Sequence, residues 1–175
     1  KTMIDNWYAT NLNKAEYTKY ISTEAGFCGD RSLYSGTGIG TTETHYGTVQ
    51  RIYSNPHPSL KCVKTEDLYT ANDSNKGNKA LIYPVGLITG DEVSFAGGKC
   101  ETVNTKFYLY TNQSFWTMSP FLIYDSASSE FNVRNDGYMY SLSVNAQEGV
   151  RPVINLKKDV KLTGDGTASN PYVVI

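Results

Sequence analysis

The chain has 175 residues, of which 39% are hydrophobic and 19% are charged, and its formal net charge is −1. A chain of this size and polarity can bury the core of one globular domain, which excludes a disordered segment and makes metals or disulfides unnecessary for stability. The small net charge gives no field that would attract DNA or RNA, and no run of about 18 apolar residues is present, so we expect neither a nucleic-acid partner nor membrane insertion of this segment.

The first part of the chain predicts helices followed by a loop. Apolar residues between Ile4 and Leu12 recur at the spacing of one face of an amphipathic helix. Asn13 and Glu16 form a candidate capping pair for a short second helix. Residues 22–48 are rich in Gly, Ser and Thr and predict a long ordered loop.

The middle of the chain predicts extended segments and one helix. Prolines divide residues 49–70 into two short extended pieces, and Leu81–Ile88 is an apolar extended run. Thr89 and Glu92 form a capping box at the start of a helix, and the Gly97-Gly98 pair ends it.

From residue 107 onward the pattern predicts strands separated by Asn, Asp, Gly and Ser turns. The expected strands are Phe107–Tyr110, Phe115–Ser119, Glu130–Val133, Tyr138–Val144, Val150–Leu156 and Tyr172–Ile175. Gly137 indicates a hairpin, and Pro152 indicates a sheet edge or a strand start. We therefore expect one α+β domain over residues 1–175, with a helical and loop part over 1–80 and a sheet-rich core over 81–175.

The cysteines and histidines indicate no metal site. Cys28, Cys62 and Cys100 allow one internal disulfide with one thiol left over, and three free thiols are the alternative. They form no C-x-x-C pair, and His45 and His57 have no Cys or carboxylate at ligand spacing. Neither a G-x-S-x-G elbow nor a complete phosphate-loop motif is present, so we expect no catalytic residues, no cofactor and no enzymatic activity.

Several segments together resemble a known family. Phe115–Pro120 and Gly149–Leu156 are similar to the C-terminal half of C-type-lectin-like domains, in the formylglycine-generating-enzyme-like branch that includes variable proteins of diversity-generating retroelements. Upstream, residues 4–8, 26–32, 60–62 and 83–93 resemble surface and pilin-associated proteins of gut Firmicutes. The resemblance runs from about residue 4 to residue 175.

The resemblance implies a C-type-lectin-like fold with N-terminal helices and small antiparallel sheets. It also implies a Cys28–Cys62 disulfide, with Cys100 left over, and an extracellular or cell-surface location. The chain departs from the family in two ways. The calcium-binding patterns of sugar-binding lectins are missing, and no cysteine follows Cys100, so the activity of the formylglycine-generating enzymes is not expected.

The aromatic residues indicate where a ligand would bind. Residues 107–140 contain ten of the 22 aromatic residues. The segment 121–126 places apolar and aromatic side chains where a turn is expected, and an exposed patch of that kind commonly binds a partner. Tyr138 and Tyr140 alternate along a strand and present rings on one face, with ordinary core packing as the alternative. The expected ligand-binding residues are Phe121, Leu122, Ile123, Tyr124, Asp125, Ser126, Arg134, Tyr138, Tyr140 and Asn145.

These features predict an extracytoplasmic module for adhesion or recognition, with a protein or glycan on a cell or phage surface as its ligand. A structural domain of a pilus or surface assembly, without a separate ligand, is the alternative. Residues 121–128 contain only residue types that random replacement of adenines in Asn-type codons yields, which agrees with a retroelement-diversified face, although eight residues also meet this condition by chance. The sequence leaves the oligomeric state open.

Overall fold

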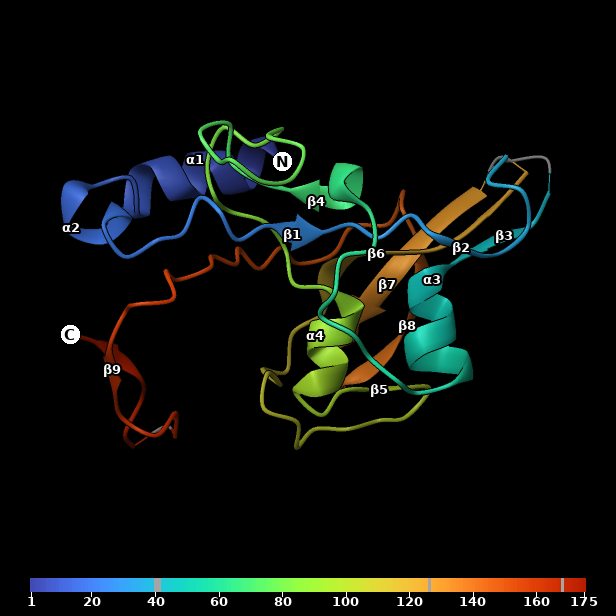
Figure 1. Cartoon of the computed structure of the whole chain (residues 1–175). Helices are drawn as coiled ribbons and strands as arrows, with labels where there is room; N and C mark the ends of the chain where they lie inside the picture. Colours follow the sequence, from blue (N-terminus) through green and yellow to red (C-terminus); the bar gives the residue numbers. More distant parts are fainter. Residues whose placement is uncertain (40–41, 126, 168) are drawn as a thin grey trace.

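A computed structural model describes residues 1–39, 42–125, 127–167 and 169–175 of the chain. The fold is mixed α+β and is built around a six-stranded sheet with strand order β2-β3-β6-β7-β8-β5 (Figure 1). The helical segments are α1 (Thr2–Asn11), α2 (Ala15–Thr18), α3 (Gly47–Val49), the π-helical turn η1 (Gln50–Ser54), the 3-10 turn η2 (Thr65–Asp67) and α4 (Gly90–Phe95). The α+β class expected from the sequence is confirmed.

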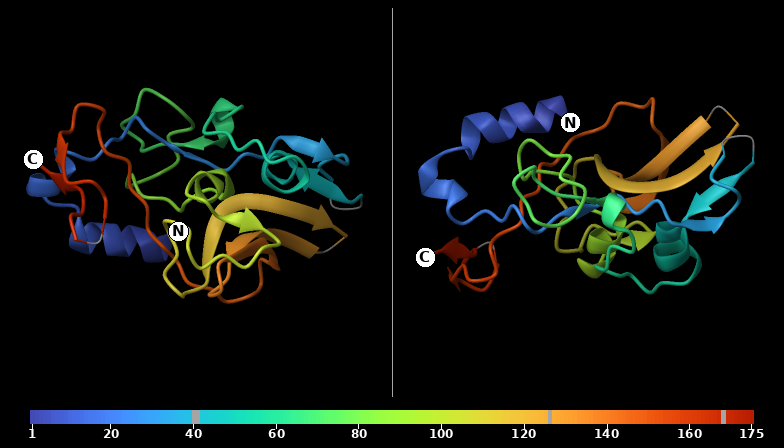
Figure 2. Two further views of the ribbon diagram at one scale, coloured as in Figure 1. Left: turned by 90° about the horizontal axis from the view of Figure 1, so that it is seen from below. Right: turned by 45° about the horizontal axis from the view of Figure 1, so that its top comes forward.

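Strands from both halves of the chain form the large sheet. Its members are β2 (Leu33–Ser35), β3 (Thr44–Tyr46), β5 (Lys99–Cys100), β6 (Phe115–Tyr124), β7 (Ala127–Val133) and β8 (Tyr138–Ser143). All neighbouring strands are antiparallel except β5 and β8. The pairing of β6 with β7 shifts register on both sides of Pro120, whose ring nitrogen carries no hydrogen for the ladder, and these two strands form a curved ribbon (Figure 2).

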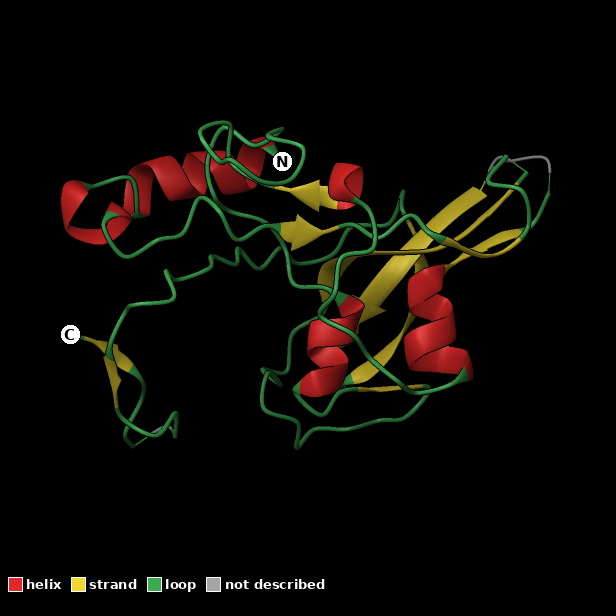
Figure 3. Ribbon diagram, in the orientation of Figure 1, coloured by secondary structure: helices red, strands yellow, loops and turns green. Residues whose placement is uncertain are grey.

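The remaining strands form two small two-stranded sheets. β1 (Phe27–Cys28) pairs with β4 (Leu68–Tyr69), and β9 (Leu162–Thr163) pairs with β10 (Val173–Val174), both in antiparallel fashion. Figure 3 shows α1 and α2 at one end of the molecule and α3 and α4 beside the large sheet. Among the described residues, none of the helices combines the length and the apolar character needed to cross a lipid bilayer.

The main core lies between the large sheet and the helical segments α3, η1 and α4. Val49, Ile52 and Val93 of these segments pack with buried strand residues such as Phe115 and Phe131. The backbone N–H of Gly90 donates to the Ser119 Oγ at 2.9 Å, which fixes the start of α4 on β6. Since Ser119 points toward α4, its neighbours along β6 point to the other face of the sheet.

A second, smaller core joins the N-terminal helix to the segments around Val85 and Ile154. Ile4 and Tyr8 of α1 pack with Ile21 and Val85, and the rings of Tyr8 and Tyr83 stack with their centroids 5.2 Å apart. An antiparallel bridge between Ile21 and Leu156 holds the segment after α2 against the C-terminal part of the chain.

Four local signals in the sequence are confirmed: the first helix, the capping box and two glycine turns. The helix expected around Ile4 is α1, and the Thr89 hydroxyl accepts from the Glu92 N–H at 3.1 Å while the Glu92 carboxylate accepts from the Thr89 N–H at 2.8 Å. Gly97 follows α4 with φ +96°, and Gly137 turns between β7 and β8 with φ +78°. A side chain at Gly137 would bring its Cβ into the carbonyl oxygen of Asn104, so only glycine fits this turn.

Predictions for the first half of the chain are wrong in three places. The loop expected over residues 22–48 contains β1, β2 and β3; β1 pairs with β4 and β3 pairs with β6, and both partners lie far along the chain. The second helix begins at Ala15 and has no side-chain cap, so Asn13 does not cap it. Residues 47–54 are helical rather than extended, because this places Val49 and Ile52 on the same core.

Predictions for the second half are wrong where tertiary contacts decide the conformation. Phe107–Tyr110 forms turns, in which the N–H of Tyr110 donates to the Phe107 carbonyl oxygen at 3.0 Å. Val150–Leu156 makes isolated bridges at Val153 and Leu156 instead of a strand. Residues 121–124 of the turn expected at residues 121–126 form a strand instead. β6 continues past Pro120 and stays paired with β7 to its last residue, Tyr124, which lies opposite Ala127.

Candidate functional site

Four aromatic side chains from three elements meet at one side of the large sheet. We call them the aromatic strip: Tyr53 of η1, Phe121 of β6, and Tyr138 and Tyr140 of β8. The Phe121 ring lies edge-to-face against Tyr140, with centroids 5.2 Å apart, and against Tyr53 at 6.3 Å. Tyr140 in turn lies 5.7 Å from Tyr53 and 6.4 Å from Tyr138. These separations are typical of favourable aromatic pairs.

The members of the aromatic strip differ in exposure. Phe121 is only 4% exposed and belongs to the core, so its predicted role as an exposed ligand contact is wrong. Tyr138 and Tyr140 are half-buried, and Tyr53 is 38% exposed. Phe121 therefore supports Tyr53 and Tyr140 from below, and Tyr138 packs on Tyr140, while all three tyrosines stay partly exposed to solvent.

Tyr53 is a member of the strip that the sequence does not reveal. It follows Ile52 in a segment that looks extended, and only the π-helical turn η1 carries its ring to β6 and β8. The negative charge of Glu101 is the main cause of a raised pKa at Tyr53, and Tyr140 adds to it. The Tyr53 hydroxyl therefore stays protonated at neutral pH and serves as a hydrogen-bond donor and acceptor.

The remaining predicted residues fall into two groups. Arg134 lies at the turn between β7 and β8, where its guanidinium carbon is 5.2 Å from the centroid of the Tyr138 ring, and so it extends the aromatic strip. Tyr124 and Asp125 lie at the other end of β7; Tyr124 is 53% exposed and Asp125 is exposed with φ +52°. Arg134 and the pair Tyr124 and Asp125 therefore lie at opposite ends of β7.

Leu122 and Ile123 pair with β3 in the sheet and are half-buried, so they present little surface to a ligand. Leu122 is half-buried opposite His45 and packs against the main core, and Ile123 is half-buried opposite Thr44. Asn145 is exposed just beyond Val144, whose N–H donates to the Ser128 carbonyl oxygen at 3.0 Å, so it lies near the end of the β6–β7 hairpin. Ser126 lies outside the described residues.

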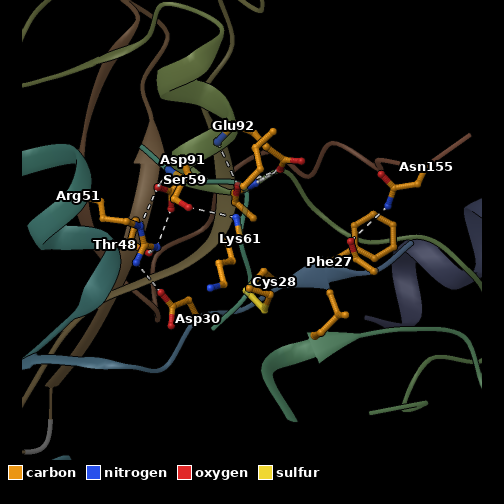
Figure 4. Close-up of a pocket in the computed structure, with 15 residues that line it drawn as sticks. Phe27, Cys28, Asp30, Thr48, Arg51, Ser59, Lys61, Asp91, Glu92 and Asn155 are labelled. Carbon is orange, nitrogen blue, oxygen red and sulfur yellow. Dashed lines mark hydrogen bonds and ion pairs between the residues drawn. A yellow bond between two sulfur atoms is a disulfide. The ribbon is translucent and has the colours of Figure 1, made fainter. Parts of the chain in front are cut away.

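A pocket of about 240 Å³ holds a buried ion-pair network (Figure 4). Arg51 donates from Nε and Nη2 to the two carboxylate oxygens of Asp91 at 2.9 and 2.8 Å, and from Nη1 to the Asp30 Oδ2 at 2.7 Å. Asp30 and Asp91 are each 3% exposed, and the Ser59 N–H donates to Asp91 at 2.8 Å. Each of these groups has hydrogen-bond partners, so the network fixes structure and leaves no unpaired donor or acceptor for a ligand, although one guanidinium facing two carboxylates leaves it a net charge of −1.

The disulfide that the family resemblance implies is present. Cys28 of β1 is bonded to Cys62, and the two residues line the pocket of the Arg51 network. Cys100 is free, and burial raises the pKa of its thiol to about 12, so it is protonated and a poor nucleophile at neutral pH. The disulfide fits an oxidising, extracytoplasmic compartment.

A second cleft, of about 370 Å³, lies on the face of β6 that points away from α4 and the main core. Met118 and Pro120 form its floor together with Tyr46 of β3, and Tyr69 of β4 lines it from the small sheet. Glu130 of β7, directly opposite Pro120, contributes a carboxylate. Burial raises the pKa of Glu130.

Replacing Glu130 by glutamine is expected to stabilise the protein at neutral pH. Since the folded pKa lies above the ordinary value of 4.5, the unfolded chain loses the proton first, and stability falls as the pH rises between the two values. The half-buried carboxylate then costs about 1 kcal/mol, so thermal melts should show Glu130→Gln unfolding about 2–4 °C higher at pH 7 and close to wild type at pH 4. The exposed Glu16→Gln change is the control, and a lower melting temperature for Glu130→Gln at pH 7 would contradict the expectation.

Within the part of the chain that the structure describes, no group of three or more His, Cys, Asp or Glu side chains is arranged to hold a metal ion. The aromatic strip offers contact area and hydrogen bonds.

Comparisons with protein-family models, with curated proteins and with solved structures found no match for this chain.

Proposed function

We propose that this domain is an extracytoplasmic ligand-binding module for adhesion or recognition, and that the aromatic strip and the hairpin tip form its contact surface. The hairpin tip is Tyr124, Asp125 and Ala127, at the turn between β6 and β7. The observation that carries the proposal is that Tyr53 and Tyr140 pack on one buried phenylalanine, Tyr138 packs on Tyr140, and all three tyrosines remain partly exposed to solvent.

Rigid tyrosines suit this role on energetic grounds. A tyrosine has few rotatable bonds, so its ring gives a large contact area for a small loss of side-chain entropy on binding. The packing of the strip on Phe121 has already restricted these rings in the free protein, which lowers the cost of association. The hairpin tip and the Arg134 end of the aromatic strip are separated by the seven residues of β7, about 20 Å along the strand, so a ligand that contacts both parts is a macromolecule.

The chemistry of the surface favours a protein or glycan ligand. Its rings present apolar faces, and its hydroxyls, the Arg134 guanidinium and the Asp125 carboxylate provide polar contacts at the margins. The resemblance of two C-terminal segments to C-type-lectin-like variable proteins supports the same class of function. The residue types at 121–128 agree with diversification by a retroelement.

The proposal predicts that a surface variant loses binding and keeps its fold. The variant is Tyr53→Ser, Tyr124→Ser and Tyr138→Ser; Tyr140 is left in place because it packs directly on Phe121. Probed as a multimer against arrays of cell-surface proteins and glycans, it should bind the ligands of the wild-type domain about 30-fold more weakly or worse, since interface tyrosines commonly contribute about 2 kcal/mol. Its unfolding temperature should fall by only a few degrees.

A matched control separates the surface from exposed rings in general. Tyr17 and Tyr172 are 41% and 58% exposed and lie on α2 and near the C-terminal strand pair, so their replacement by serine should leave binding unchanged. Equal loss of binding in both variants would refute the proposed surface. The wild-type domain could instead bind no array ligand and associate with itself. If the surface variant abolished that self-association, the domain would be an assembly domain of a pilus or surface layer.

A further inference from the structure

The cleft beside Glu130 has apolar walls and continues into a second cavity. Tyr69, Leu87 and Met118 line both the 370 Å³ cleft and an adjoining cavity of about 340 Å³. Gly29 forms part of the wall without a side chain, and a Cβ there would lie 3.1 Å from the Tyr69 ring and 3.6 Å from the Met118 methyl carbon. Each volume is at the lower end of the range for small-ligand sites.

Glu130 is the charge in this cleft that lacks a counterion. Among the residues that the structure describes, no ion pair or side-chain hydrogen bond is formed to its carboxylate. Arg31, the basic residue of the lining, donates from Nε to the Asp67 Oδ1 at 2.6 Å, and Asp67 is 1% exposed. Arg31 and Asp67 neutralise each other, so the cleft retains about one uncompensated negative charge.

A half-buried carboxylate without a partner destabilises a fold, and such costs concentrate at functional sites. The ligand that relieves this cost carries a positive charge. The walls around it are formed by Met118, Pro120, Leu87 and the tyrosine rings, which favour methylene groups and the cation–π contacts of an ammonium or guanidinium group. An anionic ligand would be repelled by Glu130.

We propose that this cleft receives a basic side chain, lysine or arginine, of a protein ligand, with its methylene groups against Met118 and Leu87 and its cation at the Glu130 carboxylate. The site is distinct from the aromatic strip, because Met118 and Pro120 alternate along β6 with Ser119 and Phe121, which face α4 and the core. A single cation in a cleft of this size binds weakly by itself, so the side chain acts as an anchor within a larger protein interface.

The three methionines of the chain provide the measurement. Met118 lines the cleft, Met139 is fully buried, and Met3 is 70% exposed on α1. In the domain labelled with ¹³C at the methionine methyl groups, Nα-acetyl-lysine N-methylamide and its arginine counterpart at millimolar concentrations should shift the Met118 resonance in a saturable way. The resonances of Met3 and Met139 should stay in place, and the uncharged norleucine analogue should shift Met118 far less.

Variants distinguish a charge-dependent anchor from incidental contact. Glu130→Gln should weaken the basic probes about tenfold or more, and Gly29→Val should block them by filling the cleft, while Glu16→Gln should leave them unchanged. An unperturbed Met139 resonance shows in each variant that the core is intact. No Met118 shift with either basic probe, an equal shift with the norleucine analogue, or full binding by Glu130→Gln would each overturn the proposal.

Discussion

Replacing Arg51 by methionine is expected to lower the free energy of unfolding by about 3–5 kcal/mol, because it leaves two buried carboxylates without their counterion. Asp30 and Asp91 are each 3% exposed, and Arg51 donates three hydrogen bonds to them. The network joins η1 to α4 and to the segment after β1, so its loss also weakens the packing of both helical segments on the sheet. Chemical denaturation monitored by circular dichroism measures the change.

Two further variants test the cause. Arg134→Met removes an ion pair to Asp136 that is exposed to solvent, and it should cost less than about 1 kcal/mol. Adding Asp30→Asn and Asp91→Asn to Arg51→Met removes the uncompensated charges and should restore part of the stability. A loss below about 1 kcal/mol in Arg51→Met would show that the network does not hold these elements together.

The same network predicts the direction of a pH effect. Burial alone would raise the pKa of Asp30, but hydrogen bonds from Ser32 and from the Arg51 guanidinium outweigh it and lower the pKa. The stabilisation from Asp30 is therefore complete above its ordinary value of 3.8 and is lost as the pH falls through the lower, folded value. The difference in stability between wild type and Arg51→Met should accordingly narrow in strong acid.

Removing the Cys28–Cys62 disulfide is the second change with a large expected effect. The two residues are separated by 34 positions, and a loop of that length corresponds to about 3–4 kcal/mol of lost stability when it is opened. For a chain of this size the double variant Cys28→Ser, Cys62→Ser should unfold roughly 10 °C below wild type. Reduction of the wild-type protein should give the same midpoint.

A variant of the free cysteine, Cys100, is the control for the loss of the disulfide. Cys100→Ser leaves the disulfide intact and should retain most of the stability, since the free thiol forms no covalent link. An unfolding midpoint unchanged by reduction would contradict the expected effect. The disulfide and the Arg51 network line the same pocket, so the two losses should not be simply additive.

The elements that could be predicted from the sequence are those whose structure is decided by neighbouring residues. The capping box at Thr89 and the turn at Gly137 depend on contacts within a few residues or on a backbone angle that only glycine readily adopts. Prediction failed at Phe107–Tyr110, where a buried phenylalanine is held by turns against α4 rather than by a sheet. The helical conformation of α3 and η1 was not predictable either, because only the distant core explains why Val49 and Ile52 lie in helical turns.

The candidate surface was foreseen in part for the same reason. Tyr138, Tyr140 and Arg134 lie close to one another along the chain and meet as the alternation of β8 suggests. Phe121 falls in the turn expected over residues 121–126, yet pairing with β7 carries β6 onward and places this ring in the core. Tyr53 joins the strip through a tertiary contact that no local pattern encodes.

Hydrogen–deuterium exchange on a complex with the tightest ligand from the array tests most directly whether the tyrosine-bearing surface makes the contact. The expected result is slowed exchange in residues 50–54, 119–125 and 138–142, with α1 unaffected. Slowed exchange confined to α1 or to the pocket of the Arg51 network, with residues 119–125 unchanged, would contradict it.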